Sequence, residues 1–304
     1  MRTFSRQTFR ADFKDHKPHL NARLVELLTS GIGFRQTARL LPLSPRCTEL
    51  KFRKLARHVG DLDRNLRRPL GLGGDNDALR IHLDEFETYE ARRNTRPVSI
   101  AVLIESTSRF LIAARAAPIR ARGSMTLSRT AAIESETRRW GLRPDRSRAA
   151  TRKALKEAAR LAARSSCIIL NTDEKSTYPS LAERALAGRL LVHRRTPSKQ
   201  LRTVGNPLFP INHTEACMRD RISRLRRESW LVSKARWFLN RHLSLYAAWR
   251  NWVRPRFNKD TASPGQLLGL VPRRLRVGEL LGWRQDWGLS SPHPIGNGRR
   301  AVAS

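Results

Sequence analysis

The order of apolar segments from residue 79 onward is the feature that most constrains the fold of this chain. Three successive segments have the short, β-branched and apolar pattern of strands, and polar residues 106–108 predict a hairpin between the second and the third. Helical and strand patterns then alternate. The segments are LRIHLDEF, PVSIAVLIES, SRFLIAARAAPI, the helical SRTAAIESETRRWG and RSRAATRKALKEAARLAARS, the strand SCIILNTDE, the helical YPSLAERALAG, the strand RLLVHRRT and a helical tract over about 212–253. Since directly successive strands pair antiparallel and helices provide crossovers, this order predicts a mixed α/β sheet with flanking helices.

Residues 20–59 carry three short helical patterns, which predict a small all-α domain ahead of the sheet. The first stops at Gly31, the second stops before Pro42, and the third follows Ser44-Pro45, an expected N-cap and first-turn proline. Helix, short turn and helix, with basic residues on the last helix, is the outline of a helix-turn-helix. The residues expected to face a DNA groove or its phosphates are Arg46, Lys51, Arg53 and Lys54. The alternative is a generic three-helix bundle with a solvated charged face.

The charge of the chain bears on its partners. It has 60 Lys and Arg residues against 26 Asp and Glu residues, a formal net charge of +34. Charge of this size favours a polyanionic partner, and nucleic acid comes first because neutralising phosphates releases counterions. A membrane surface is less favoured, since the basic residues are spread over several helices and loops.

No apolar run approaches the roughly 18 residues of a spanning helix, and the N-terminus lacks a signal-peptide core. The three cysteines, Cys47, Cys167 and Cys217, form no CxxC pair, which indicates a reducing, cytosolic setting.

Acidic residues gather at the first predicted strand, in LDEFETYE. Asp84 lies on this strand, and Asp173 lies at the exit of the strand SCIILNTDE. Phosphoryl transfer with two Mg²⁺ ions needs carboxylates that converge on one point, and hard oxygen ligands suit Mg²⁺. Glu215, at the edge of the apolar stripe of the long helical tract, is the third candidate; the alternative is a helix N-terminal acid stabilised by the macrodipole. Asp220 lies on the opposite, basic face, where we expect a salt bridge.

The strand and helix order resembles that of the ribonuclease H-like fold, whose acids come from the first strand, the end of the fourth strand and the helix after the fifth. The resemblance implies a ribonuclease H-like mixed sheet with flanking helices, preceded by a small all-α helix-turn-helix domain. The expected domains are a remnant segment at 1–19, the helix-turn-helix at 20–65, a linker rich in Gly, Pro and Asp at 66–78, the catalytic domain at 79–255 and a loose C-terminal tail at 256–304.

Several longer stretches resemble a bacterial insertion-sequence transposase of the DDE superfamily, near the insertion-sequence-one type. They are RTFSRQTFRADFKDHKPHLN, LDEFETYEARRNTRPVSIAVLIE, NTDEKSTYPSL, NPLFPINHTEACMRDRISRLRRESWLVSK and SPGQLLGLVPRRLRVGELLGWRQDW. The resemblance implies that Asp84 and Asp173 are metal-binding carboxylates, with Mg²⁺ or Mn²⁺ as the cofactor. It puts the third acid near Asn212, which is not an acid, so that Glu215 substitutes, His213 becomes a ligand, or the enzyme is impaired. In related enzymes a four-cysteine zinc ribbon precedes the RTFSRQTF segment, so we expect either an N-terminal truncation or a misassigned start codon.

The long helical tract offers further DNA contacts. Basic residues around it can hold phosphates without reading bases; the candidates are Arg219, Arg224, Arg227 and Lys234. Tryptophans on the same tract can stack on unpaired bases, but an aromatic stripe at helical spacing favours the core. These tryptophans are Trp230, Trp237, Trp249 and Trp252.

The resulting expectation is a transposase that binds double-stranded DNA at element ends, cleaves it and transfers the strand. The resemblance implies a homodimer or larger synaptic oligomer in the bacterial cytoplasm, associated with the nucleoid. Two alternatives remain open: a truncated or decayed transposase that only binds DNA, and a structural RNA-binding protein explained by charge alone.

Overall fold

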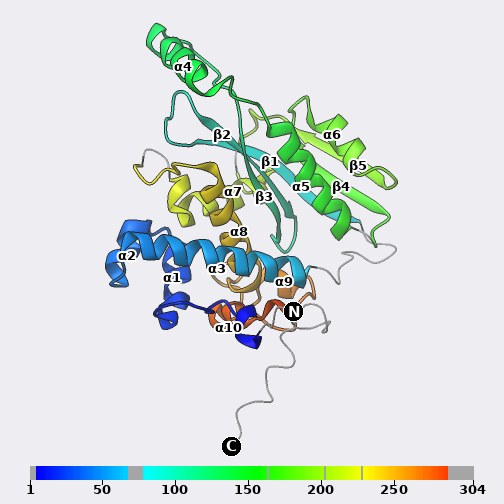
Figure 1. Cartoon of the computed structure of the whole chain (residues 1–304). Coiled ribbons are helices and arrows are strands. Elements are labelled where there is room, and N and C mark those ends of the chain that lie inside the picture. Colours follow the sequence, from blue (N-terminus) through cyan, green and yellow to red (C-terminus); the bar gives the residue numbers. More distant parts are fainter. Residues whose placement is uncertain (1–4, 68–77, 163, 202, 227–228, 287–304) are drawn as a thin grey trace, which may run out of the picture. The chain divides into compact units, whose positions relative to one another are not determined.

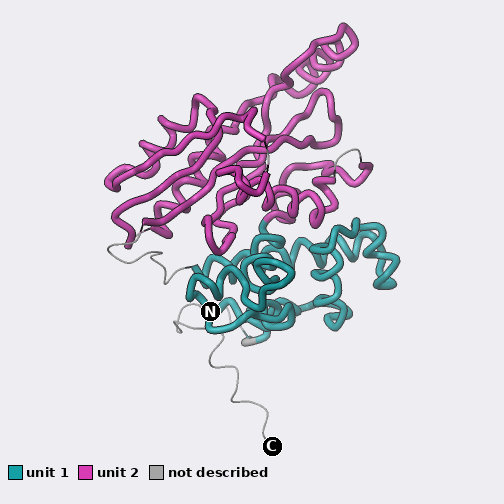
Figure 2. Tube along the Cα trace, turned by 180° about the vertical axis from the view of Figure 1, so that it is seen from behind, with its two compact units in different colours: residues 1–70, 244–304 teal, residues 71–243 magenta. Residues whose placement is uncertain are grey.

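The computed structural model describes residues 5–67, 78–162, 164–201, 203–226 and 229–286. The chain forms two compact units (Figure 2): unit 1 comprises residues 1–70 and 244–304, and unit 2 comprises residues 71–243. The predicted linker falls almost wholly outside the described residues. None of the helices in the described ranges combines the length and apolar character needed to cross a membrane.

Unit 2 contains a five-stranded mixed sheet (Figure 1). Its strands are β1 Leu79–Tyr89, β2 Pro97–Glu105, β3 Leu111–Pro118, β4 Cys167–Asp173 and β5 Leu190–Thr196. Their order across the sheet is β3-β2-β1-β4-β5. β2 is antiparallel to β1 and β3, whereas β4 is parallel to β1 and β5 is parallel to β4. The predicted α/β sheet, with three antiparallel strands and two more joined through helical crossovers, is confirmed.

Helices cover both faces of this sheet. α5 (Ser147–Leu161) packs on β2 and β3, and α6 (Tyr178–Ala185) packs on α5. α7 (Phe209–Arg221) packs on β1 and β2. Because successive side chains of a strand point to opposite faces, β1 sends Leu83 and Glu85 toward α5 and Asp84 toward α7. Between β3 and α5 lies α4 (Leu127–Trp140), in which no residue is buried.

The predicted continuous helix over 212–253 is wrong, because the tract is broken. α7 ends at Arg221, Ile222 has extended backbone, a 3₁₀ turn follows at Ser223–Leu225, and α8 runs over Arg236–Trp252. Ser233 instead forms an isolated bridge with Glu90 at the end of β1. This contact joins segments far apart in the sequence, so helical periodicity alone does not reveal it.

Unit 1 contains the three predicted N-terminal helices, α1 (Asn21–Leu28), α2 (Phe34–Leu40) and α3 (Pro45–Leu66). Ser44 caps α3 as expected, since its hydroxyl accepts a hydrogen bond from the Cys47 backbone N–H at 3.1 Å. The other N-terminal elements are 3₁₀ turns at Arg6–Phe9 and Pro18–Leu20.

The C-terminal segment is more ordered than predicted. Its described part, up to residue 286, contains α9 (Pro264–Leu267) and α10 (Val277–Gly282), and α10 packs on α1 and α3 within unit 1. Leu270, Val271 and Trp283 are buried. The loose tail is therefore wrong for residues 256–286, while 287–304 lie outside the described residues. The structure groups residues from 244 onward with the N-terminal helices, whereas the sequence predicted a boundary at 255. Scattered apolar residues do not reveal which helices they pack against.

Candidate active site

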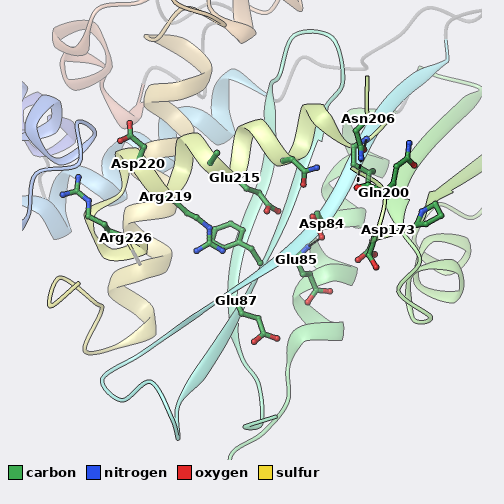
Figure 3. A pocket seen from close by; sticks show the side chains of 16 residues that line it. Asp84, Glu85, Glu87, Asp173, Gln200, Asn206, Glu215, Arg219, Asp220 and Arg226 are labelled. Carbon is green, nitrogen blue, oxygen red and sulfur yellow. Dashed lines mark hydrogen bonds between the residues drawn. The ribbon is translucent and has the colours of Figure 1, made fainter. Parts of the chain in front are cut away.

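A pocket of about 760 Å³ lies in unit 2 between β1, the end of β4 and α7. Figure 3 shows the side chains that surround it. All three carboxylates predicted from the sequence border it. The charged residues that line it, together with Asn212, are Asp84, Glu85, Glu87, Asp173, Glu215, Arg219, Asp220 and Arg226.

The pairing of β1 with β4 explains why two of the acids meet. His82 pairs with Asn171 in a parallel register. Two residues further along both strands come Asp84 and Asp173, and because side chains alternate, both keep the orientation of that pair. The two carboxylates therefore lie on one face of neighbouring strands, at the edge where β4 ends.

α7, which packs on β1 and β2, carries the third carboxylate, Glu215. Asn212, Glu215, Ala216 and Arg219 line the pocket, and this spacing defines one side of a helix. Figure 3 shows Glu215 pointing from α7 toward β1. Glu215 lies well beyond the first turn of a helix that begins at Phe209, so stabilisation by the macrodipole does not explain it.

The candidates for the third ligand on α7 differ in whether they border the pocket. His213 is absent from the described lining of the pocket; its ring lies 5.7 Å from that of Phe209. Asn212 borders the pocket one turn from Glu215. Asp220 is 72% exposed and pairs with Arg221 at 3.3 Å, so the predicted salt bridge is confirmed. Asp220 also borders the pocket, so its predicted place on the face opposite Glu215 is wrong. Both acids of α7 border the pocket, and Figure 3 shows Glu215 as the one that points toward β1.

The hydroxyl of Tyr178 lies near the acids of the pocket. It is buried and forms no hydrogen bond within the described part of the chain. Burial raises its pKa well above the ordinary value, and the negative charges of Glu85, Asp84, Asp173 and Glu215 raise it further. The negative charges of four carboxylates thus favour the protonated form of this one buried hydroxyl.

Glu85 also borders the pocket, but its carboxylate contacts β2 and α5. It accepts hydrogen bonds from Ser99 at 2.6 Å and from Thr151 at 2.8 Å, and it pairs with Lys175 at 2.8 Å. Burial by itself raises the Glu85 pKa, but the hydrogen bonds from Lys175, Ser99 and Thr151, together with the Lys175 charge, leave it below its usual value. Glu85 is therefore a carboxylate whose charge is already compensated. The sequence analysis did not predict these contacts of Glu85. The one signal for them was the alternation of side chains along β1, which points Glu85 and Asp84 in opposite directions.

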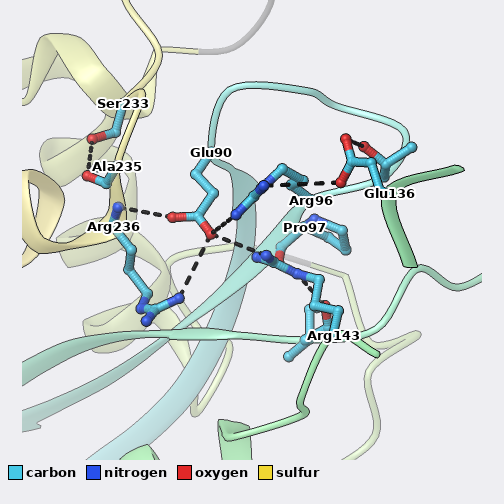
Figure 4. Close-up of polar contacts among 10 residues, drawn as sticks. Glu90, Arg96, Pro97, Glu136, Arg143, Ser233, Ala235 and Arg236 are labelled. Carbon is cyan, nitrogen blue, oxygen red and sulfur yellow. Dashed lines mark hydrogen bonds and ion pairs between the residues drawn. The ribbon is translucent and has the colours of Figure 1, made fainter. Parts of the chain in front are cut away.

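Glu90, in the same acidic stretch, is buried in a cluster of arginines (Figure 4). Its carboxylate is 3.0 Å from Arg143 Nη1 and accepts a hydrogen bond from the Arg236 backbone N–H at 2.8 Å. Guanidinium nitrogens of Arg96 and Arg236 each lie 3.6 Å away. The acids at β1 therefore divide into Asp84, Glu85 and Glu87, which border the pocket, and Glu90, which lies in a structural cluster. The expectation that this acidic stretch marks a metal site stays a prediction, and it does not apply to Glu90.

The donors at the pocket fit Mg²⁺ in their chemistry, since carboxylate oxygens are its preferred protein ligands. Within the described residues, however, no group of three or more His, Cys, Asp and Glu side chains is arranged as a ready metal cage. Mg²⁺ is commonly held by one or two carboxylates together with waters and substrate phosphates. Asp84 and Asp173 match that kind of incomplete site.

The predicted DNA contacts on α3 are placed unequally. Lys51 is 3% exposed, and its ammonium group pairs with Asp15 at 2.8 Å and donates to Asn21 at 3.0 Å. Lys54 donates to the carbonyl of Phe13. Both side chains contact the N-terminal segment. Because Lys51 is buried, the prediction that it faces DNA is wrong; Lys54 is half-buried, and its contact with DNA stays a prediction. Arg46 and Arg53 remain at the surface, where each pairs with Glu49.

The second set of predicted contacts lies near the pocket or in the loop after α7. Arg219 borders the pocket with its guanidinium 4.4 Å from the centre of the Phe86 ring. Arg224 donates to Ser233 at 3.2 Å, and Lys234 is exposed. Arg227 lies outside the described residues. Arg226, which the sequence reading did not single out from its basic neighbours, also borders the pocket.

The tryptophans divide between core and surface. Trp252 and Trp249 are buried, as predicted for a core stripe. Trp230 is 99% exposed and Trp237 is 43% exposed, so the core prediction is wrong for these two. Trp230 lies in the break between α7 and α8, and Trp237 lies in the first turn of α8.

No protein-family model matches this chain, and no curated protein matches it significantly. The function is therefore inferred from the fold and the pocket.

Proposed function

We propose that the protein is a DNA transposase of the DDE, ribonuclease H-like kind. One observation carries the proposal: Asp84 and Asp173 share one face of adjacent parallel strands, and Glu215 borders the same pocket from the helix after β5. The sheet order β3-β2-β1-β4-β5 supports it, because the ribonuclease H-like fold has this order and draws its acids from these elements.

The charge around the pocket supports DNA as the substrate. Arg219 and Arg226 border the same pocket as the three carboxylates, within a chain of net charge +34. Arginine holds phosphate oxygens through several N–H groups in a fixed plane, which fixes the register of a nucleic acid without reading its sequence. Helices α1 to α3 are proposed as a helix-turn-helix for the element ends, with Arg46 and Arg53 as the surface contacts that remain.

The residues of the chain have distinct tasks in this proposal. Asp84, Asp173 and Glu215 would hold Mg²⁺ or Mn²⁺, and the bound metal would supply a stronger nucleophile and neutralise charge on the phosphate. Arg219 and Arg226 orient the scissile strand in the pocket. Little covalent chemistry is needed from the protein, because positioning accounts for much of such catalysis. The proposal includes a homodimer or larger assembly acting on nucleoid DNA in the bacterial cytoplasm, since two element ends must be joined.

A second candidate is a transposase-derived protein that binds DNA without cutting it. The absence of a ready metal cage in the described residues favours it. So does Asn212, which borders the pocket where the resemblance implies an acid.

A nicking and binding experiment separates the two candidates. Supercoiled plasmid is incubated with the full chain in Mg²⁺, in Mn²⁺ and in EDTA, and duplex binding is measured in parallel. We expect metal-dependent nicking that falls by about 100-fold or more in Asp84→Asn and Asp173→Asn, the scale on which charged groups act at a reacting centre. Asp220→Asn is the matched control, because this exposed acid also borders the pocket. Duplex binding without metal-dependent nicking would support the second candidate, and absence of both would refute the two together.

A further inference from the structure

At the pocket, an ion pair connects Glu85 on β1 with Lys175 in the turn that follows β4. The Glu85 side chain is 6% exposed, and its partner Lys175 is 30% exposed. Their charged groups are 2.8 Å apart. Glu85 is fixed by Ser99 on β2 and by Thr151 on α5, so Lys175 pairs with a carboxylate that is already held in place.

The same two residues also contact the aspartates through their backbones. The N–H of Glu85 donates to Asp84 Oδ1 at 2.7 Å. The N–H of Lys175 donates to Asp173 Oδ1 at 3.1 Å. Each aspartate of the pocket thus receives a backbone hydrogen bond from one member of the ion pair.

Tyr178 completes the surroundings of Lys175. The ammonium group lies 5.4 Å from the centre of the Tyr178 ring, and this tyrosine is fully buried at the start of α6. A cation between a carboxylate and an aromatic face has few other positions of similar energy. The turn from Asp173 to Lys175 is therefore held at both its backbone and its side chain.

We propose that Glu85 and Lys175 form a positioning pair that sets the separation and orientation of the Asp84 and Asp173 carboxylates. The inference rests on the proposed function, because it concerns the same metal-binding site. Neither residue needs to touch metal or DNA for this role. The pair closes a chain of contacts that runs from Asp84 through Glu85 and Lys175 to Asp173, across the junction of β1 and β4.

The inference is tested with Mn²⁺ alone as the probe. Binding of Mn²⁺ to the full chain is measured by electron paramagnetic resonance for the wild type, Glu85→Gln, Lys175→Met and the double variant. Each single variant is expected to weaken Mn²⁺ binding by about 10-fold to 100-fold, as the loss of groups that orient metal ligands does. The double variant is expected to bind as weakly as either single variant, because both changes break one link.

Two controls distinguish positioning from general damage. Glu157→Gln removes an ion pair of similar length, 3.1 Å, between Arg115 on β3 and Glu157 on α5, away from the pocket. It is expected to leave Mn²⁺ binding unchanged. Lys175→Arg keeps the charge and the backbone N–H, and it is expected to recover most of the affinity lost in Lys175→Met. Thermal unfolding identifies variants that no longer fold; if Glu85→Gln is among them, the Lys175 variants decide the test.

The outcomes separate this inference from the proposed function. Wild-type Mn²⁺ affinity in folded Glu85→Gln and Lys175→Met would overturn the positioning pair and leave the transposase proposal intact. Losses that multiply in the double variant would also overturn it, because the two residues would then act independently. A wild-type protein that neither binds Mn²⁺ nor nicks DNA would overturn both.

Discussion

Replacing Glu90 by Gln removes one buried charge from a cluster of three arginines without changing the size of the side chain. Glu90 is 4% exposed, and it accepts the Arg236 backbone N–H at 2.8 Å and lies 3.0 Å from Arg143 Nη1. Glutamine keeps one acceptor oxygen, but its NH₂ group faces guanidinium donors. The change therefore leaves buried positive charge without its counter-charge.

The contacts allow the size of the effect to be worked out. A hydrogen bond to a charged group contributes about 1.5–3 kcal/mol, and breaking a buried ion pair costs about 3–5 kcal/mol. The Arg96 and Arg236 side chains are each 33% exposed and 3.6 Å from Glu90, so water offsets most of their loss. Arg143, at 17% side-chain exposure, carries most of the effect. We expect Glu90→Gln to lower the free energy of unfolding of unit 2 by about 3 kcal/mol, at the lower end of the range for a broken buried pair.

Hydrogen exchange followed by mass spectrometry is the suitable assay, because it reports on unit 2 separately from unit 1. The peptides to follow cover the end of β1 and residues 233–236, which Glu90 joins. Glu136→Gln is the matched control: its carboxylate pairs with Arg92 at 3.3 Å and with Arg96 at 3.9 Å, and a loss of about 1 kcal/mol is expected there. The reasoning is refuted if Glu90→Gln costs no more than Glu136→Gln.

Three further predictions concern unit 1. Gly265→Ala places a Cβ 2.3 Å from Trp252 Cζ3, so it should lower the melting temperature at a cost of about 1–3 kcal/mol, and an unchanged melting curve would contradict the packing. Burial lowers the His58 pKa from 6.5 to about 4, so the unfolded chain alone takes up this proton as pH falls from 6.5 to 4. Urea titrations should show stability complete above that window and reduced by about 3 kcal/mol at its lower end, with His58→Gln removing this dependence. Ser44→Ala deletes the cap of α3 and should cost about 1 kcal/mol by chemical denaturation, whereas Ser44→Asp should cost much less.

Local patterns predicted the five strands and the N-terminal helices, and they singled out two of the three acids that border the pocket. The strand runs, the hairpin and the start of α3 depend on side-chain alternation and on residues a few positions apart, which a sequence displays directly. Asp84 and Asp173 follow from the same information, because each is placed by the strand that it ends or interrupts. Glu215 was one of several open choices, and the orientation of α7 favours it.

The order of the strands, the strong positive charge and the strands that carry the two aspartates can all be predicted from the amino-acid sequence. Which charged side chains are exposed depends on the folded structure. Lys51 is buried against Asp15, Glu85 pairs with Lys175, and Glu90 gathers arginines from three other segments. Each of these contacts joins residues distant in the chain, and the choice among many basic partners depends on which backbone segments the folded core brings together. Periodicity records which face of an element is apolar, but the partner of a charged side chain is set by the packing of the whole unit.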